Sequence, residues 1–201
     1  MNKKITIILF LIFVILTLLV KFYPIVTSFD LIIIKNLQDL LSGLPCYIPE
    51  LPDCKLYSVM VALPLVCGSV WFSKEKLYNQ ILLLCSIPLV TFLLNCCVKP
   101  LIHRPRPPFE LQLSVHPHSF SYVSSHSLVT FCLYAMVIYY FCKSCKNQLL
   151  RNFVVIFSCL WILFVGFSRI WLGVHHLTDV LSAYLLGAIL VNLYVKLGEK
   201  L

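Results

Sequence analysis

Long runs of apolar residues are the feature of this sequence that most constrains its fold. Crossing the apolar core of a bilayer, which is about 30 Å thick, takes roughly 17 to 25 apolar residues in a helix. Six runs have this character, with approximate bounds 5–22, 56–72, 77–98, 124–142, 152–168 and 178–197. We therefore expect an all-α polytopic membrane protein built as a bundle of six transmembrane helices.

Composition supports this class of protein. Hydrophobic residues make up 60% of the chain and charged residues 12%, whereas soluble domains average about 25% charged residues. The length of 201 residues suits a single membrane-embedded domain spanning 1–201. The net charge of +8 comes mostly from short connections, where basic residues set topology or bind phosphate groups. We therefore expect the bilayer to be a partner and nucleic acid not to be one, while the oligomeric state stays open.

Two segments near the N-terminus need separate interpretation. Residues 5–22 resemble a signal peptide, but no small-residue cleavage site precedes Lys21, which favours an uncleaved anchor. Residues 25–45 form a shorter amphipathic stretch that ends near Gly43. We expect this stretch to be a short interfacial helix in the first outer loop rather than a span.

The distribution of basic residues predicts the orientation. Cytoplasmic connections of membrane proteins carry an excess of Lys and Arg. The N-terminus, the connections 73–76 and 143–151 and the C-terminal tail are short and basic, so we place them in the cytoplasm. The opposite face carries loops 21–55 and 99–123 and connection 169–177. Loop 99–123 is also basic, and its charges therefore need a functional explanation.

Ionisable residues gather where four of the apolar runs reach this outer face. Such groups at the rim of a helix bundle are functional candidates. His175 and Asp179 stand four residues apart, so a helix that starts near His175 would place them on one face. The carboxylate could then fix the imidazole tautomer and leave its other nitrogen free as a nucleophile. The converging residues are Lys99, Arg106, Ser124, His126, Arg169, His175 and Asp179.

These residues suit a phosphoryl group. Three cations, Lys99, Arg106 and Arg169, match its negative charge and the charge that develops on its oxygens during transfer. Ser124, Ser125 and His126 open the fourth predicted span, where free backbone N–H groups favour an anion. His126 is then placed to protonate a leaving oxygen as a general acid.

The motifs resemble a known family. Lys99-x6-Arg106-Pro107, Ser124-Ser125-His126 and Ser168-Arg169-x5-His175-x3-Asp179 are similar to the three-part signature of type 2 phosphatidic acid phosphatases. That superfamily includes lipid phosphate phosphatases of bacterial membranes and the haloperoxidases. The resemblance covers about residues 56–197. The second motif departs from the usual Pro-Ser-Gly-His, because this chain has Val123 and Ser125 at the Pro and Gly positions.

The resemblance implies a two-step hydrolysis that needs neither metal nor cofactor. His175 would attack phosphorus to form a phosphohistidine, and Asp179 would orient it. His126 would protonate the leaving group and later activate water. The phosphate-binding residues would be Lys99, Arg106, Ser124, Ser125 and Arg169.

We therefore expect a lipid phosphate phosphatase of the bacterial cytoplasmic (inner) membrane, with its site facing the exterior or periplasm. Its substrate would be a phosphomonoester or diphosphate lipid of the phosphatidic acid, phosphatidylglycerophosphate, undecaprenyl diphosphate or lipid A type. The alternatives are a lipid phosphotransferase with the same site and a non-catalytic lipid-binding relative. A small transporter is a third alternative, but it would need a polar path through spans that carry almost no charges.

Several residues keep two interpretations. Arg104 stands beside Arg106, and its contact with phosphate or lipid headgroups is left open. His176 is off the motif and is assigned a structural role. His116 and His118 could form a metal pair, but a solvated loop is favoured because no cysteine or carboxylate partner stands nearby. Cys46 and Cys54 share the predicted first outer loop, as a disulfide or as two free thiols.

Overall fold

A computed structural model describes residues 3–45, 54–74, 78–113 and 117–200 of the chain. Within these ranges the regular structure is entirely helical. A short 3-10 helix, η1 (Phe109–Leu111), lies in the loop before α6. The α-helices are α1 (Lys3–Phe22), α2 (Pro24–Leu40), α4 (Cys54–Lys74), α5 (Tyr78–Ile102), α6 (Ser125–Ser144), α7 (Gln148–Trp171) and α8 (Leu177–Gly198).

The apolar runs explain most of these helices. An α-helix satisfies its own backbone hydrogen bonds, which a segment surrounded by lipid requires. Five helices, α1, α5, α6, α7 and α8, are long and apolar enough to cross a membrane. In α4 the apolar helical stretch that is described covers only Val61–Lys74. Its role as a sixth span therefore remains a prediction.

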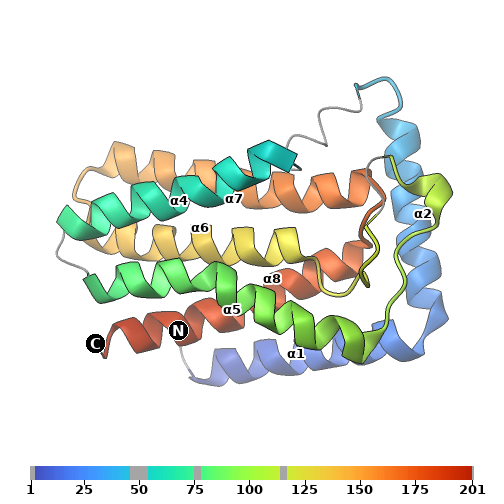
Figure 1. The fold of residues 1–201 in the computed structure, drawn as a ribbon, viewed down its shortest axis with the longest axis horizontal. Helices are drawn as coiled ribbons and strands as arrows, with labels where there is room; N and C mark the ends of the chain where they lie inside the picture. Colours follow the sequence, from blue (N-terminus) through green and yellow to red (C-terminus); the bar gives the residue numbers. More distant parts are fainter. Residues whose placement is uncertain (1–2, 46–53, 75–77, 114–116, 201) are drawn as a thin grey trace.

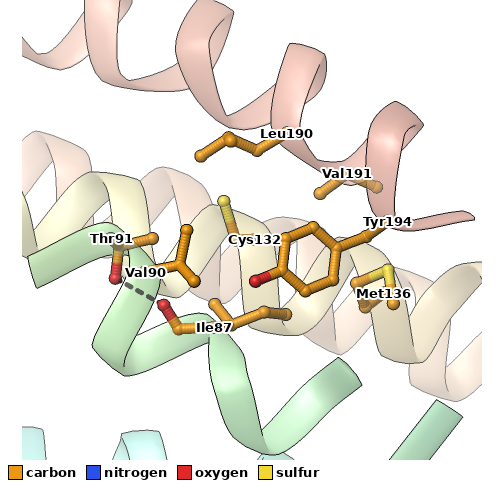
Figure 2. Close-up of a pocket in the computed structure, with 8 residues that line it drawn as sticks. All are labelled: Ile87, Val90, Thr91, Cys132, Met136, Leu190, Val191 and Tyr194. Atoms are coloured by element: carbon orange, nitrogen blue, oxygen red, sulfur yellow. Dashed lines mark hydrogen bonds between the residues drawn. The ribbon is translucent and has the colours of Figure 1, made fainter. Parts of the chain in front are cut away.

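Helix α6 forms the centre of the bundle. It packs against α4, α5, α7 and α8, and α1 packs against α8 (Figure 1). Between α5, α6 and α8 the side chains around Cys132 and Tyr194 leave essentially no room for a water molecule. Figure 2 shows that these side chains point from the three helices into the space between them.

Helix α2 differs from the others in direction. It lies across one end of the bundle, whereas α1 begins and α8 ends toward the opposite end (Figure 1). It packs against α1, α7 and α8 and buries Asp30 and Ile34. The predicted helix within 25–45 is therefore present, and its position at a membrane interface remains a prediction.

The loop after α5 and the connection from α7 to α8 lie at the same end of the bundle as α2 (Figure 1). Helix α5 ends at Ile102, and His103 follows with a φ of 56°, a left-handed conformation that commonly ends helices. The Lys21 ammonium of α1 donates to the carbonyl of Leu101, 2.9 Å away, which ties α1 to this end of α5. This end of the bundle therefore gathers the loops that carry the predicted site.

Candidate active site

The connection between α7 and α8 turns the chain back on itself. Helix α7 continues to Trp171, three residues past the end of the predicted run 152–168. The Arg169 carbonyl accepts hydrogen bonds from the backbone N–H groups of Val174 and His175, both at 3.2 Å. Helix α8 begins at Leu177, one residue before the predicted run 178–197 and two residues after His175. His175 therefore lies in the connection, and its position is set by this turn.

Gly173 makes the turn possible. Its φ is +66°, and a Cβ at this position would lie 1.9 Å from the backbone oxygen of Leu111 in η1. The backbone N–H of Leu113 donates to the carbonyl of Leu172 at 3.0 Å. A side chain at 173 would therefore collide with backbone that is held in place, and it would also require a strained φ.

We predict that Gly173→Ala destabilises the protein. The left-handed conformation alone costs a non-glycine residue about 1–2 kcal/mol, and the collision with Leu111 adds to that cost. Gly43→Ala is the matched control, because nothing lies within 4 Å of a Cβ at Gly43. Thermal unfolding in detergent should show a lower Tm for Gly173→Ala only. Equal Tm values for the two variants would contradict this account of the turn.

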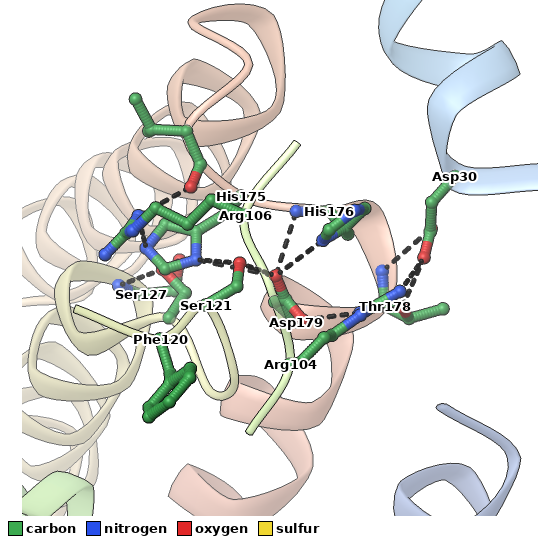
Figure 3. A network of polar contacts seen from close by, with 12 residues as sticks. Asp30, Arg104, Arg106, Phe120, Ser121, Ser127, His175, His176, Thr178 and Asp179 are labelled. Carbon is green, nitrogen blue, oxygen red and sulfur yellow. Dashed lines mark hydrogen bonds and ion pairs between the residues drawn. The ribbon is translucent and has the colours of Figure 1, made fainter. Parts of the chain in front are cut away.

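His175 and Asp179 are brought together although His175 is outside the helix. The distance from His175 Nδ1 to Asp179 Oδ2 is 3.5 Å, and the exposed fractions of the two residues are 3% and 0%. The Ser121 hydroxyl donates to Asp179 Oδ2 at 2.5 Å and lies 3.3 Å from His175 Nδ1 (Figure 3). One side of the imidazole is thus held by a carboxylate and a hydroxyl.

The other imidazole nitrogen of His175 faces a cation. Arg106 Nη1 lies 3.4 Å from His175 Nε2 (Figure 3), and it donates to the Val174 carbonyl at 2.6 Å. Lys99 is held close by, because its ammonium contacts Ser119 Oγ at 3.4 Å. Arg106 Nη2 donates to that same hydroxyl at 3.1 Å. The structure therefore gathers Lys99 and Arg106 on the side of the imidazole opposite Asp179.

Arg169 and the first residues of α6 are the remaining predicted site residues. Arg169 is the third residue from the end of α7, is 1% exposed and donates to Ser168 Oγ through Nε at 3.2 Å. Ser124 is the N-cap of α6, and its side chain accepts from the backbone N–H of Ser127. Ser125 and His126 are half-buried in the first helical turn. The Ser124 N–H also donates to the backbone carbonyl of Asp179 at 3.4 Å, which joins α6 to α8.

Burial keeps the His175 imidazole uncharged. It lowers the pKa of His175 from its ordinary value of 6.5 to about 3, and the positive charge of Arg106 acts in the same direction. The hydrogen bond to Asp179 raises that pKa but does not outweigh burial. A neutral imidazole has a free lone pair on one nitrogen, and the carboxylate beside Nδ1 favours the tautomer that leaves it on Nε2.

Arg104, for which two interpretations were open, contacts carboxylates. Its guanidinium donates to Asp179 Oδ1 at 2.5 Å and to Asp30 Oδ2 at 2.7 Å. It is 4% exposed. Its charge is therefore committed to two buried anions.

His176 has the structural role expected of it. It is the N-cap of α8 and forms a capping box with Asp179. Its backbone N–H donates to Asp179 Oδ2 at 2.9 Å, and its Nδ1 lies 3.2 Å from the same oxygen. The second of the adjacent histidines thus holds the start of α8 and the Asp179 side chain.

The remaining predictions concern loops that are described only in part. Within the described ranges, no three His, Cys, Asp or Glu side chains form a group able to hold a metal ion. His118 lies in this part of the chain and is exposed, whereas His116 lies outside it. Cys46 also lies outside the described residues, so the predicted Cys46–Cys54 alternatives stay open.

Ser121 and Asp30 are contacts of the site that the sequence did not identify. Neither belongs to a motif, and Asp30 stands far from Asp179 along the chain. One signal was available for Asp30: it is a lone carboxylate in the strongly apolar stretch 25–34. A charge in such a setting is rarely buried unless it is paired.

Comparisons with known proteins agree with the motifs. The family model described as PAP2 superfamily matches residues 80–201. Phosphatidylglycerophosphatase B of Bacillus subtilis is 33% identical over 145 residues, which are 72% of this chain and 70% of that protein. Lipid phosphate phosphatase delta of Arabidopsis thaliana is 26% identical over 170 residues, which are 80% of this chain but only 38% of that protein.

A solved structure extends the similarity to the whole fold. The crystal structure of a transmembrane PAP2-type phosphatidylglycerolphosphate phosphatase from Bacillus subtilis superposes with a TM-score of 0.78 at 30% identity. The match covers 98% of this chain and 96% of that one. Together with the apolar helices, it identifies an integral membrane protein. The chain belongs to the PAP2 superfamily and is a phosphatase, a hydrolase of phosphoric esters.

Proposed function

We propose that the protein is a lipid phosphate phosphatase that works through a phosphohistidine at His175. The observation that carries this proposal is the environment of the His175 imidazole. Asp179 and Ser121 lie at Nδ1 and the Arg106 guanidinium lies at Nε2. A phosphoryl group drawn to Arg106 and Lys99 would therefore meet the nitrogen that carries the lone pair.

The proposed reaction has two steps. His175 Nε2 forms a bond to phosphorus while the bond to the leaving oxygen breaks, and His126 gives that oxygen a proton. Water then attacks the phosphohistidine and gives a proton to His126, the P–N bond breaks, and inorganic phosphate leaves. Lys99, Arg106 and Arg169 would hold the phosphate oxygens, with Ser124 and the Ser125 N–H assisting. Neither step requires a metal ion.

A cavity beside the start of α6 supports a substrate with an apolar tail. It has a volume of about 460 Å³, enough to hold part of a lipid chain. Its walls come mostly from apolar side chains of α4, α5 and α6, and it reaches Ser125. The lining residues include Val61, Leu65, Pro88, Phe92, Ser125 and Val129. A lipid whose tail lies in this cavity would hold its phosphate near the predicted phosphate-binding residues.

Phosphatidylglycerophosphate is the substrate we place first. The bacterial relative that is 33% identical is named for this activity, and so is the solved structure. Phosphatidic acid, undecaprenyl diphosphate and lipid A present the same chemistry, a phosphate or diphosphate on an amphiphile. We propose that the site faces the outer side of the cytoplasmic membrane of a bacterium, where such headgroups are accessible.

Phosphate release from a substrate panel tests the proposal. The purified protein would be assayed in detergent with a chelator against these four lipids and a soluble sugar phosphate. We expect hydrolysis of at least one lipid phosphate, fastest for phosphatidylglycerophosphate, and little activity on the sugar phosphate. Activity that needs an added divalent metal would refute the metal-independent mechanism. A preference for the soluble substrate would refute the assignment as a lipid phosphatase.

The low pKa of His175 predicts a particular pH dependence of stability. In the unfolded chain the imidazole takes up a proton near pH 6.5, whereas in the folded protein it does so only near pH 3. The unfolded state therefore binds more protons between these values, and His175 costs the fold up to about 1.4 kcal/mol per pH unit as the pH falls through this window. Above pH 6.5 this effect is absent.

We predict that Tm falls more steeply below pH 6.5 in the wild type than in His175→Asn. The measurement is thermal unfolding in detergent at a series of pH values from 7.5 to 4.5. Because other groups titrate in both proteins, the difference between the two curves isolates His175. Parallel curves would show that the folded and unfolded pKa values of His175 are alike, contrary to the buried neutral imidazole.

A further inference from the structure

Helix α2 supplies a buried carboxylate that the proposed mechanism does not use. Asp30 lies in the middle of α2 and is 0% exposed. Its Oδ2 accepts from Arg104 Nη2 at 2.7 Å and from the Thr178 hydroxyl at 2.5 Å. Its Oδ1 accepts from the backbone N–H of Thr178 at 3.2 Å. Asp30 therefore satisfies a free N–H in the first turn of α8, although it belongs to a distant helix.

Arg104 joins this carboxylate to the one beside the nucleophile. Its Nη1 donates to Asp179 Oδ1 and its Nη2 donates to Asp30 (Figure 3). Because Arg104 occupies Oδ1 of Asp179, the other oxygen, Oδ2, is the one turned toward Ser121 and His175. The guanidinium thus fixes which oxygen of Asp179 serves the imidazole.

The charges of the three residues matter as much as their geometry. Asp30, Arg104 and Asp179 carry two negative charges and one positive charge in a setting that is nearly closed to water. Their sum is one negative charge, which lies beside the imidazole that becomes positive when it attacks phosphorus. Without the charge of Asp30, the positive charge of Arg104 would cancel that of Asp179. The net negative charge that stabilises the attacking imidazole would then be lost.

We propose that Asp30 is a positioning residue of the active site, which acts through Arg104 to orient the Asp179 carboxylate and preserve its negative charge toward His175. Helix α2 then contributes to catalysis as well as covering the end of the bundle. This inference rests on the proposed phosphohistidine function. It concerns the rate of the chemical step and not the binding of the lipid, since Asp30 contacts Arg104 and Thr178 rather than the predicted phosphate-binding residues.

The test compares three variants on the lipid that the wild type hydrolyses best. Asp30→Asn keeps the shape of the side chain and removes its charge, whereas Asp30→Glu keeps the charge. Gln38→Leu is the matched structural control, because Gln38 ties α2 to the site loops without a charge. Its Nε2 donates to the carbonyls of Leu111 and Trp171, both at 2.8 Å.

Tm would be measured for each purified variant. Steady-state kinetics would then be measured at a temperature well below the lowest of these Tm values. We expect Asp30→Asn to lower kcat on the order of tenfold to a hundredfold while KM stays within about twofold. Gln38→Leu should lower Tm with little change in kcat, and Asp30→Glu should recover most of the kcat lost in Asp30→Asn. The rate of phosphoenzyme formation in a single turnover should fall in parallel with kcat.

Three outcomes would overturn the inference. One is a kcat for Asp30→Asn equal to that of the wild type, and another is a loss in Gln38→Leu as large as that in Asp30→Asn. The third is a folded Asp30→Glu protein whose kcat is a hundredfold or more below that of the wild type, a measurement that does not depend on whether Asp30→Asn folds. Failure of the proposed function itself would look different, because the wild type would then release no phosphate from any lipid in the panel.

Discussion

Replacing His175 with asparagine is expected to abolish lipid phosphate hydrolysis, with a loss on the order of 10⁵-fold or more, as for other enzymes deprived of their nucleophile. The asparagine amide has about the size of the inner part of the imidazole but offers no basic nitrogen at the position of Nε2. Phosphorus then has no attacking atom, and the phosphate bound near Arg106 and Lys99 would remain esterified. The loss should appear in kcat, because these cations are untouched.

The covalent intermediate gives a second, independent measurement of the same prediction. Rapid quenching of the wild type under basic conditions, followed by mass spectrometry, should find a phosphate on the peptide that contains His175. No such peptide should appear in His175→Asn. Labelling at another residue would contradict the assignment of the nucleophile.

His176→Asn is the comparison that separates the two adjacent histidines. The same chemical change is made one position later, at the N-cap of α8, where asparagine is itself a favoured residue. We expect a far smaller loss of activity, because no step of the proposed reaction uses the His176 ring. Equal losses in the two variants would mean that spacing to Arg169 and Asp179 does not identify the nucleophile.

The sequence was sufficient to predict the helices because lipid imposes one strong requirement. A span must be long, apolar and helical, and α5, α6, α7 and α8 lie within a few residues of the predicted runs. The start of α8 was predicted to within one residue, whereas α7 ends three residues past its predicted run, and the shape of the connection between them was not predicted. That shape depends on the left-handed Gly173 and on the capping box of His176 and Asp179. Both are local features that hydropathy does not report.

The site was predictable only where its residues form motifs. Arg106, His175 and Asp179 follow fixed spacings, and the structure brings them into contact or close to it. Asp30 reaches the site only because α2 folds across the end of the bundle (Figure 1). Ser121 enters it because the loop before α6 returns to Arg104, whose carbonyl accepts from the Ser121 N–H at 2.9 Å. Such contacts depend on tertiary structure, and no spacing in the sequence specifies them.

Asp179→Asn is expected to produce the second largest loss, on the order of 10³ to 10⁴-fold in kcat, as when the aspartate of a catalytic triad becomes asparagine. The contacts of Asp179 explain why an isosteric change should be so harmful. Arg104 donates to Oδ1, whereas Oδ2 accepts from the Ser121 hydroxyl and the His176 N–H. The asparagine oxygen must stay with Arg104, so its NH₂ group would point toward groups that are themselves donors.

The replacement of an acceptor by a donor at this position also changes the protonation of His175. An NH₂ group at the position of Oδ2 would donate to His175 Nδ1, 3.5 Å from that oxygen in the wild type. The imidazole proton would then move to Nε2, which removes the lone pair from the nitrogen facing Arg106. The variant would hold a histidine of the right shape in the wrong tautomer.

Asp30→Asn serves as the control for stability in this experiment. Each substitution removes one of the two negative charges paired with Arg104, and breaking a buried ion pair costs about 3–5 kcal/mol, so both variants should have a lower Tm than the wild type. Asp179→Asn also disturbs the hydrogen bonds from Ser121 and the His176 N–H and the contact with His175, so its Tm should fall at least as far as that of Asp30→Asn. With both proteins assayed while folded, we expect a kcat for Asp179→Asn lower than that of Asp30→Asn by at least about tenfold. Equal kcat values would mean that Asp179 acts on activity through the buried charges alone, because the tautomer of His175 would then have no measurable effect.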